Sequence, residues 1–334
     1  MKKFLAALLL VAVAAAIGAG AILYDIARYA DTPVESIPDT LFFEIRRGQS
    51  FEAVAGSLED KGVIEHPRKF SLIARYTGHD KTIRYGEYRI SPDMTPMDIL
   101  ERFSRGDVVL HRVTIPEGFG MHQIAKRMEQ AELCDAERFM ELATDPEFVS
   151  AVGIPAETLE GYLYPDTYFF ERNPSAETVI RAMVRRFDET FTGQWKERAE
   201  ALGYNVHEIV TLASIIEKET GNPEERTKVS SVFHNRLNRN MRLDSDPTVI
   251  YGIEDFDGRI RTRHLRTHTP YNTYTQRGLP PGPIASPGFE SLYAALYPVE
   301  TDYLFFVAKS RNEHHFSKTY DEHRQAVQKY ILGN

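Results

Sequence analysis

The stretch 205-NVHEIVTLASIIEKETG-221 decides how we expect the rest of the chain to be organised, because it predicts a single buried helix. Asn205 is a favourable N-cap, and Glu208 stands where a capping-box carboxylate reaches back to it. Gly221 suits the left-handed position after a helix, and Pro223 prevents direct continuation. Between these ends almost no polar face remains, so the helix belongs inside a domain. The apolar positions are Ile209, Val210, Leu212, Ala213, Ile215 and Ile216.

The last turn of this helix carries two acids, Glu217 and Glu219, where the helix dipole disfavours carboxylates. Such an acid is either paired or kept protonatable for chemistry. Successive helical residues turn by about 100°, so the two acids point to nearly opposite sides and at most one faces a given substrate. Glu217 shares its face with small side chains, including Ala213 and Ser214, whereas Glu219 follows a bulkier face. The pattern favours Glu217 as the reactive acid; a salt bridge with a basic residue is the commoner use of such a position.

Length and composition set the class of protein. The 334 residues are enough for two soluble domains beside an anchor, and 42% hydrophobic with 26% charged residues is ordinary for a globular chain. A net charge of −8 argues against a nucleic-acid binder. The single cysteine, Cys134, excludes an internal disulfide and a cysteine-based metal site.

The N-terminus predicts the compartment. Lys2 and Lys3 precede an uncharged run over residues 4–24, about the length needed to cross a bilayer. The basic residues place the tail, residues 1–3, in the cytoplasm and the remainder outside it. A cleaved signal peptide is the alternative, because small residues fill 14–21. The apolar run is longer than a usual signal-peptide core, so we expect a single-pass anchor in the inner (plasma) membrane and an extracytoplasmic chain.

After a proline-punctuated stem over residues 25–40, the chain repeats a short pattern. Ile45-x-x-Gly48 and Ile115-x-x-Gly118 are each followed by apolar residues spaced by three and four, which predicts a strand, a turn and an amphipathic helix. Residues 41–118 carry no pattern of catalytic groups and are expected to form a small binding or spacer module. From residue 121 onward helices dominate, at 121–131, 136–144, 176–192 and 192–202 before the buried helix. The predicted class is α+β.

Seven further blocks accompany these patterns: L-E-G-Y-L-Y-P-D-T-Y (159–168), A-S-I-I-E-K-E-T (213–220), V-F-H-N-R-L (232–237), S-D-P-T-V-I-Y-G (245–252), Y-N-T-Y (271–274), G-L-P-P-G-P-I (278–284) and H-F-x-x-T-x-x-E-H (315–323). Together they resemble the YceG-like family of membrane-anchored endolytic murein transglycosylases over essentially the whole chain. Asp244, Ser286 and Arg324 depart from the residues usual in that family, which affects fine substrate contacts. The resemblance implies a transmembrane anchor, a LysM-like glycan-binding subdomain within 41–118 and a helix-rich mixed α+β catalytic domain over 119–334.

The resemblance also implies the chemistry and the partners. Glu217 is the implied catalytic residue, acting without cofactor or metal on peptidoglycan glycan strands, with peptidoglycan synthases as candidate partners. It would protonate the oxygen that leaves C1 of N-acetylmuramic acid and then take the proton of the C6 hydroxyl, leaving a 1,6-anhydro end. Ordinary glycosidases need two carboxylates, but here the sugar supplies its own nucleophile. The apolar neighbours of Glu217 favour its protonated form.

A group of polar and aromatic residues is expected to line the cleft. Tyrosines interleaved with acids stack on sugar rings and bind hydroxyls, although each can instead fix a loop by hydrogen bonding. The expected residues are Asp246, Tyr271, Asn272, Tyr274, Glu160 and Tyr168. Two other functions stay open at this point: a non-catalytic glycan-binding scaffold, and a hydrolase in which Asp246 or Glu160 supplies a second carboxylate.

Overall fold

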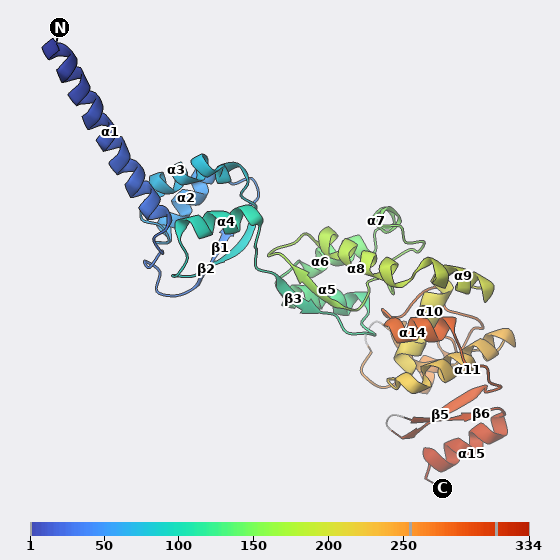
Figure 1. Cartoon of the computed structure of the whole chain (residues 1–334). Helices are drawn as coiled ribbons and strands as arrows, with labels where there is room; N and C mark the ends of the chain where they lie inside the picture. Colours follow the sequence, from blue (N-terminus) through green and yellow to red (C-terminus); the bar gives the residue numbers. More distant parts are fainter. Residues whose placement is uncertain (1, 254–255, 311–312, 334) are drawn as a thin grey trace. The chain divides into compact units, whose positions relative to one another are not determined.

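The computed structural model of the chain describes residues 2–253, 256–310 and 313–333, and Figure 1 shows its elements in order. The chain divides into two compact units. The first comprises Met1–His111 together with the short segment Phe169–Arg172, and the second comprises Arg112–Tyr168 and Asn173–Asn334. The boundary therefore falls a few residues before the Gly118 expected from the repeat, and the first unit takes a segment from later in the chain.

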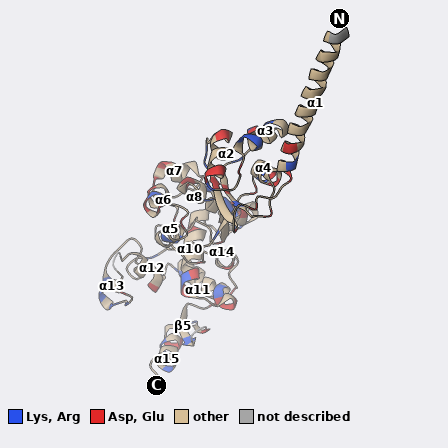
Figure 2. Cartoon of the chain, turned by 90° about the vertical axis from the view of Figure 1, so that its left-hand side faces the viewer, with Lys and Arg blue, Asp and Glu red and all other residues tan. Residues whose placement is uncertain are grey.

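Helix α1 (Lys2–Ala30) is the one helix in the described part of the chain that is long and apolar enough to cross a membrane. It runs beyond the expected 4–24 because its last turn packs into the first unit, where Ala30 is buried. Asp25 pairs with Lys69 at 2.7 Å. In Figure 2, α1 is uncharged along most of its length, and charged residues begin at its base.

The first unit is built from two strand–helix pairs. It contains β1 (Leu41–Ile45), α2 (Phe51–Asp60), α3 (Pro67–Thr77), η1 (His79–Lys81), β2 (Gly86–Ile90) and α4 (Pro96–Arg105). β1 and β2 pair antiparallel, with Leu41 opposite Ile90. Ser50 caps α2, and Thr95 forms a capping box with Asp98 on α4. The core is mainly aliphatic with five aromatic side chains, and the predicted small α+β module is a mixed unit of helices and strands.

The second unit is mainly helical. Its elements before α10 are β3 (His111–Thr114), α5 (Met121–Gln130), α6 (Ala136–Ala143), α7 (Pro146–Ala151), β4 (Thr167–Phe170), α8 (Ala176–Thr190) and α9 (Gly193–Ala201). Those from α10 onward are α10 (Val206–Glu219), η2 (Pro223–Glu225), α11 (Arg226–Asn238), α12 (Asp246–Tyr251), α13 (Thr262–Arg266), α14 (Phe289–Leu296), β5 (Phe305–Ser310), β6 (Glu313–Ser317) and α15 (Tyr320–Tyr330). The helices expected between residues 121 and 221 all form, with ends shifted by one or two residues.

Helix α10 is the buried centre of the second unit. The predicted capping box is present: the Asn205 side chain accepts from the Glu208 N–H, and the Glu208 carboxylate accepts from the Asn205 N–H. All eight residues from Ile209 to Ile216 are buried. The helix packs against α14 and α11, both of which follow it in the chain. The predicted position of α10 and its burial are therefore confirmed.

The end of α10 differs from the expectation. Thr220 adopts an extended conformation, with φ −140° and ψ 128°, and breaks the helix directly after Glu219. Gly221 does not take a positive φ, so the left-handed glycine stop predicted there is wrong. The chain instead leaves α10 extended, and Asn222 caps the short helix η2. This exit places both acids of the last turn at the helix terminus.

A cap substitution tests the importance of α10. Asn205→Ala removes the side-chain acceptor of the capping box, so the free energy of unfolding should fall by about 1 kcal/mol. Differential scanning fluorimetry should record a lower Tm. Asn205→Ser restores an acceptor and should recover most of the loss; equal losses in both variants would mean that the cap does not stabilise the helix.

Candidate active site

Glu217 lies in an ion-pair cluster at the end of α10. Its carboxylate accepts from Arg226 Nη2 at 3.3 Å and from the Gly288 N–H at 3.1 Å, and its side chain is 7% exposed. Arg226, 8% exposed, also lies 3.5 Å from the carboxylate of Glu117. Lys218 donates to the Gly118 carbonyl at 3.2 Å. The cluster ties the turn before α5, the end of α10 and the starts of α11 and α14 together.

In this cluster one guanidinium, that of Arg226, lies near two carboxyl groups. Burial, and then the negative charge of Glu217, raise the pKa of Glu117, while the Arg226 guanidinium opposes that rise. Arg226 therefore stands between the two carboxylates and pairs with both. A buried carboxylate held by a guanidinium and a backbone N–H is suited to fixing a helix end.

Glu219 points to a different environment. It lines a cavity of about 350 Å³ in the second unit. The Ser245 hydroxyl donates to its carboxylate, and across the cavity the Tyr274 hydroxyl donates to Asp246 at 2.8 Å. The other residues lining this cavity are Arg236, Leu243, Asp244, Phe305, Phe306, Tyr320 and His323. The cavity thus combines an acid, aromatic rings and hydrogen-bonding groups.

The protonation of Glu219 suits proton transfer. Burial raises the pKa of Glu219 to about 7, and the negative charge of Asp246 acts in the same direction. The hydrogen bond from Ser245 and the positive charge of Arg236 oppose this rise without cancelling it. A carboxyl that titrates near neutrality can both donate and accept a proton under working conditions.

The two acids thus have different surroundings: Glu219 lines a cavity, whereas Glu217, the acid that the sequence pattern and the resemblance indicated, is ion-paired. The small residues on the Glu217 face suggested room for a ligand, but the side chain of Arg226 and the backbone of Gly288 occupy the positions next to its carboxylate. The commoner use of a helix-end acid, a salt bridge, describes Glu217. The bulky face of α10 that precedes Glu219 packs into the core, but in the last turn of the helix Glu219 itself lines the cavity.

The remaining expected site residues divide into three groups. Asp246 and Tyr274 lie in the cavity with Glu219. Asn272 is 1% exposed; its Nδ2 donates to three carbonyls in and directly after α13, and its Oδ1 accepts from the Tyr274 N–H. Asn272 therefore supports the cavity wall through Tyr274. The Tyr168 hydroxyl donates to the Tyr164 carbonyl at 2.6 Å, which is also a loop-fixing contact.

Glu160 and Tyr271 lie together at a second cavity of about 450 Å³. The buried carboxylate of Glu160 accepts from the first N–H of α5, that of Met121, and from the Tyr251 hydroxyl. Burial raises the pKa of Glu160 to about 7. The rings of Tyr251 and Tyr271 pack with their centroids 4.7 Å apart. Glu160 and Tyr271, which were expected in one cleft with Asp246 and Tyr274, therefore lie at a different cavity from that of Glu219.

Comparison with known proteins shows which family the chain belongs to. The model of the YceG-like family matches residues 43–329. The chain belongs to the YceG-like family. It is 35% identical over 314 residues to a Bacillus subtilis protein named endolytic murein transglycosylase, covering 87% of this chain and 85% of that protein. A Streptococcus pneumoniae protein of the same name is 27% identical over 319 residues, covering 86% of this chain and 58% of that protein.

A solved structure gives the same family. The crystal structure of a YceG-like protein from Listeria monocytogenes is 35% identical in sequence and superposes with a TM-score of 0.60, covering 86% of this chain and 99% of that one. The resemblance stated from the sequence motifs is therefore confirmed at the level of the family.

The sequence-based choice missed two residues that line the cavity, Arg236 and His323, and the buried Ser245 that bonds to Glu219. Arg236 donates to the carbonyls of Leu243 and Leu304 and so joins the loop before α12 to the start of β5. His323 stacks on Phe305 with centroids 5.2 Å apart. Each lies within a recognised motif, S-D-P-T, V-F-H-N-R-L and E-H, so motif membership was the available signal.

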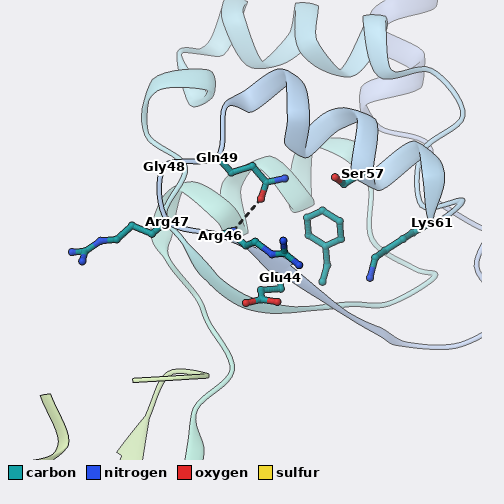
Figure 3. Close-up of a pocket in the computed structure, with 8 residues that line it drawn as sticks. Glu44, Arg46, Arg47, Gly48, Gln49, Ser57 and Lys61 are labelled. Atoms are coloured by element: carbon teal, nitrogen blue, oxygen red, sulfur yellow. Dashed lines mark hydrogen bonds between the residues drawn. The ribbon is translucent and has the colours of Figure 1, made fainter. Parts of the chain in front are cut away.

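The first unit carries a separate pocket of about 560 Å³, shown in Figure 3. The Arg46 N–H donates to the side chain of Gln49 at 3.0 Å, which shapes the turn between β1 and α2. Lys61 lies over the Phe43 ring at 5.7 Å. The lining is completed by Glu44, Arg47, Gly48 and Ser57. An aromatic ring among several donors and acceptors is suited to polar, ring-shaped ligands.

Arg226 offers a test of the cluster that holds the end of α10. Arg226→Met leaves Glu217 without its cation in a buried position, so we expect a loss of about 3 kcal/mol in the free energy of unfolding. Thermal and urea unfolding of the variant measure the loss. Arg324→Met removes an exposed pair, with Asp321, and should change stability by less than about 0.5 kcal/mol. Similar values for the two variants would contradict a supporting role for Arg226.

Proposed function

We propose that this chain is a membrane-anchored endolytic murein transglycosylase in which Glu219 is the acid and base. The proposal is supported by the names of its curated relatives and by one observation above all. Glu219 lines a cavity beside Asp246 and Tyr274 and carries a pKa raised to about 7. The substrate class is the glycan strand of peptidoglycan, and the scissile bond joins N-acetylmuramic acid to N-acetylglucosamine.

The reaction needs one carboxyl because the substrate supplies the nucleophile. Protonated Glu219 gives its proton to the glycosidic oxygen as the bond from that oxygen to C1 of N-acetylmuramic acid breaks. Positive charge develops at C1, and the C6 hydroxyl of the same sugar attacks it. The ionised carboxylate of Glu219 takes the proton of that hydroxyl. The products are a 1,6-anhydro end and a free 4-hydroxyl, no water is consumed, and the acid returns to its protonated state.

The neighbours of Glu219 serve this cycle. The carboxylate of Asp246, oriented by the Tyr274 hydroxyl, places negative charge on the side of the cavity where the oxocarbenium-like centre would form. The Ser245 hydroxyl fixes the rotamer of Glu219 by donating to it. Tyr320, which is 65% exposed, offers a ring face on which pyranose C–H groups can stack. Asp246 is a candidate catalytic residue, and Ser245 is a positioning residue.

The rest of the chain would bring this site to its substrate. Helix α1 fits a single-pass anchor, with the N-terminus in the cytoplasm and both units outside it. We propose that the first unit is the LysM-like, glycan-binding part, with its pocket between β1 and α2 as the contact surface. An anchored enzyme of this kind would act on strands still close to the membrane and so end their elongation.

A hydrolase is the second candidate, because Asp246 shares the cavity with Glu219 and would act as the base that activates water. The products separate the two functions. Isolated peptidoglycan incubated with the protein should yield fragments with 1,6-anhydro ends, identified by mass spectrometry. Reducing ends would establish hydrolysis, and glycan binding without any cleavage would establish a scaffold.

Two isosteric substitutions decide which acid reacts. Glu219→Gln removes the transferable proton and should lower the rate of anhydro-end formation at least about 100-fold. Glu217→Gln keeps the shape of the ion-pair cluster and should retain a larger share of the activity at temperatures where the variant is folded. Circular dichroism confirms folding in both. Full activity in Glu219→Gln, together with its loss in a folded Glu217→Gln, would return the role to Glu217.

The pH dependence follows from the raised pKa of Glu219. The protonated form that starts the reaction is present below pH 7 and is lost above it, so kcat/KM should fall as the pH rises through about 7. Asp246→Asn removes a negative charge that raises this pKa, so the falling limb should move to lower pH in that variant. A limb that stays in place would mean that another group controls it.

A further inference from the structure

The helix α3 lies at the base of α1 in both Figure 1 and Figure 2, at the end of the first unit that faces the N-terminal part of α1. The apolar run of α1 ends at Tyr24, and Asp25 is the first charged residue after it. Asp25 pairs with Lys69 of α3 at 2.7 Å, and the Lys69 ammonium lies 5.7 Å from the centre of the Tyr29 ring. The first residue beyond the apolar run of α1 is thus bonded directly to α3.

The position of this ion pair sets where α3 would lie relative to the membrane surface. Residues 4–24 form about 31 Å of helix at 1.5 Å per residue, which matches the hydrocarbon thickness of a bilayer. Asp25 would then emerge at the headgroup level. Because Lys69 holds α3 to that residue, α3 would lie at the same level. No flexible linker intervenes, since α1 is one helix to Ala30, which is buried in the core of the first unit.

One face of α3 is unpartnered and has the composition of an interfacial helix. Phe70, Ile73 and Ala74 pack into the core of the first unit. The opposite face presents Arg68, Leu72, Arg75 and Tyr76, spaced by three and four residues, with Leu72 52% and Tyr76 94% exposed. Arg75 pairs with Glu52, but both of those side chains are more than half exposed, so the guanidinium is accessible.

We propose that this face of α3 rests on the lipid surface of the membrane that α1 spans, with Leu72 and Tyr76 between the headgroups and Arg68 and Arg75 on anionic phosphates. Apolar and aromatic side chains flanked by arginines are typical of helices that lie in the interface. Lys69, paired with Asp25, completes the contact on the side of α1. The proposal rests on the membrane anchoring stated above, and it adds a second, lateral contact that would fix the first unit at the surface.

The test measures the depth of single sites in the full chain. A solvent-sensitive fluorophore is attached to Leu72→Cys or Tyr76→Cys in a Cys134→Ser background, and the protein is reconstituted in vesicles of phosphatidylcholine and phosphatidylglycerol. The matched control is Phe42→Cys on β1, because Phe42 is 54% exposed and apolar but lies outside α3. Lipids brominated on their acyl chains report contact with the bilayer whichever way the protein is inserted.

We expect blue-shifted emission and quenching by brominated lipid at positions 72 and 76, and aqueous emission without quenching at position 42. Arg68→Glu combined with Arg75→Glu should reduce the shift at position 72. Aqueous emission at both 72 and 76 would overturn the proposal. Because the vesicles contain no other protein, that result would indicate that this face binds a protein partner instead of lipid.

Two further measurements separate this proposal from the proposed function. Retention of the protein in the vesicles after an alkaline carbonate wash reports anchoring by α1 alone. Anhydro-end formation on added peptidoglycan reports catalysis. If the protein is retained and active while positions 72 and 76 are aqueous, only the contact of α3 fails. If the protein is washed away, anchoring by α1 fails and the contact of α3 falls with it.

Discussion

The burial of one carboxyl, that of Glu219, is the constraint on which the second unit depends. A charged carboxylate in low dielectric is costly, so the group keeps its proton up to a pH of about 7. Helix α10 creates this condition, because eight consecutive buried residues lead to its last turn and leave the acid at the edge of the core. The segment that begins α12 then brings Ser245 and Asp246 to the same place.

Two residues earlier, the same helix end carries an acid whose charge is compensated by neighbouring groups. Glu217 is also shielded from water, but Arg226 and the N–H of Gly288 compensate its charge. One acid is therefore suited to holding the structure and the other to exchanging a proton. Both acids are glutamates on the same helix, so the difference between them lies in what surrounds each carboxyl. A buried guanidinium beside one acid and an open cavity beside the other make the difference.

Local signals predicted the fold well, whereas the surroundings of the two acids could not be predicted from them. The capping box of α10, the strand–helix pairs of the first unit and the buried face of α10 follow from residues within a few positions of one another. The surroundings of the two acids come from further away: Arg226 lies nine residues beyond Glu217, and Ser245 lies 26 beyond Glu219. Helical periodicity gave the direction of each side chain but could not show which space a later helix fills.

The segment Phe169–Arg172 belongs to the first unit although its neighbours on both sides belong to the second. Arg172 forms an ion pair with Glu87, a 3% exposed residue that His111 also contacts. A gene fragment that stops after residue 111 would therefore encode the first unit without this segment, with Glu87 deprived of its guanidinium partner. A recombinant chain that carries the first unit needs both segments to keep this carboxylate compensated.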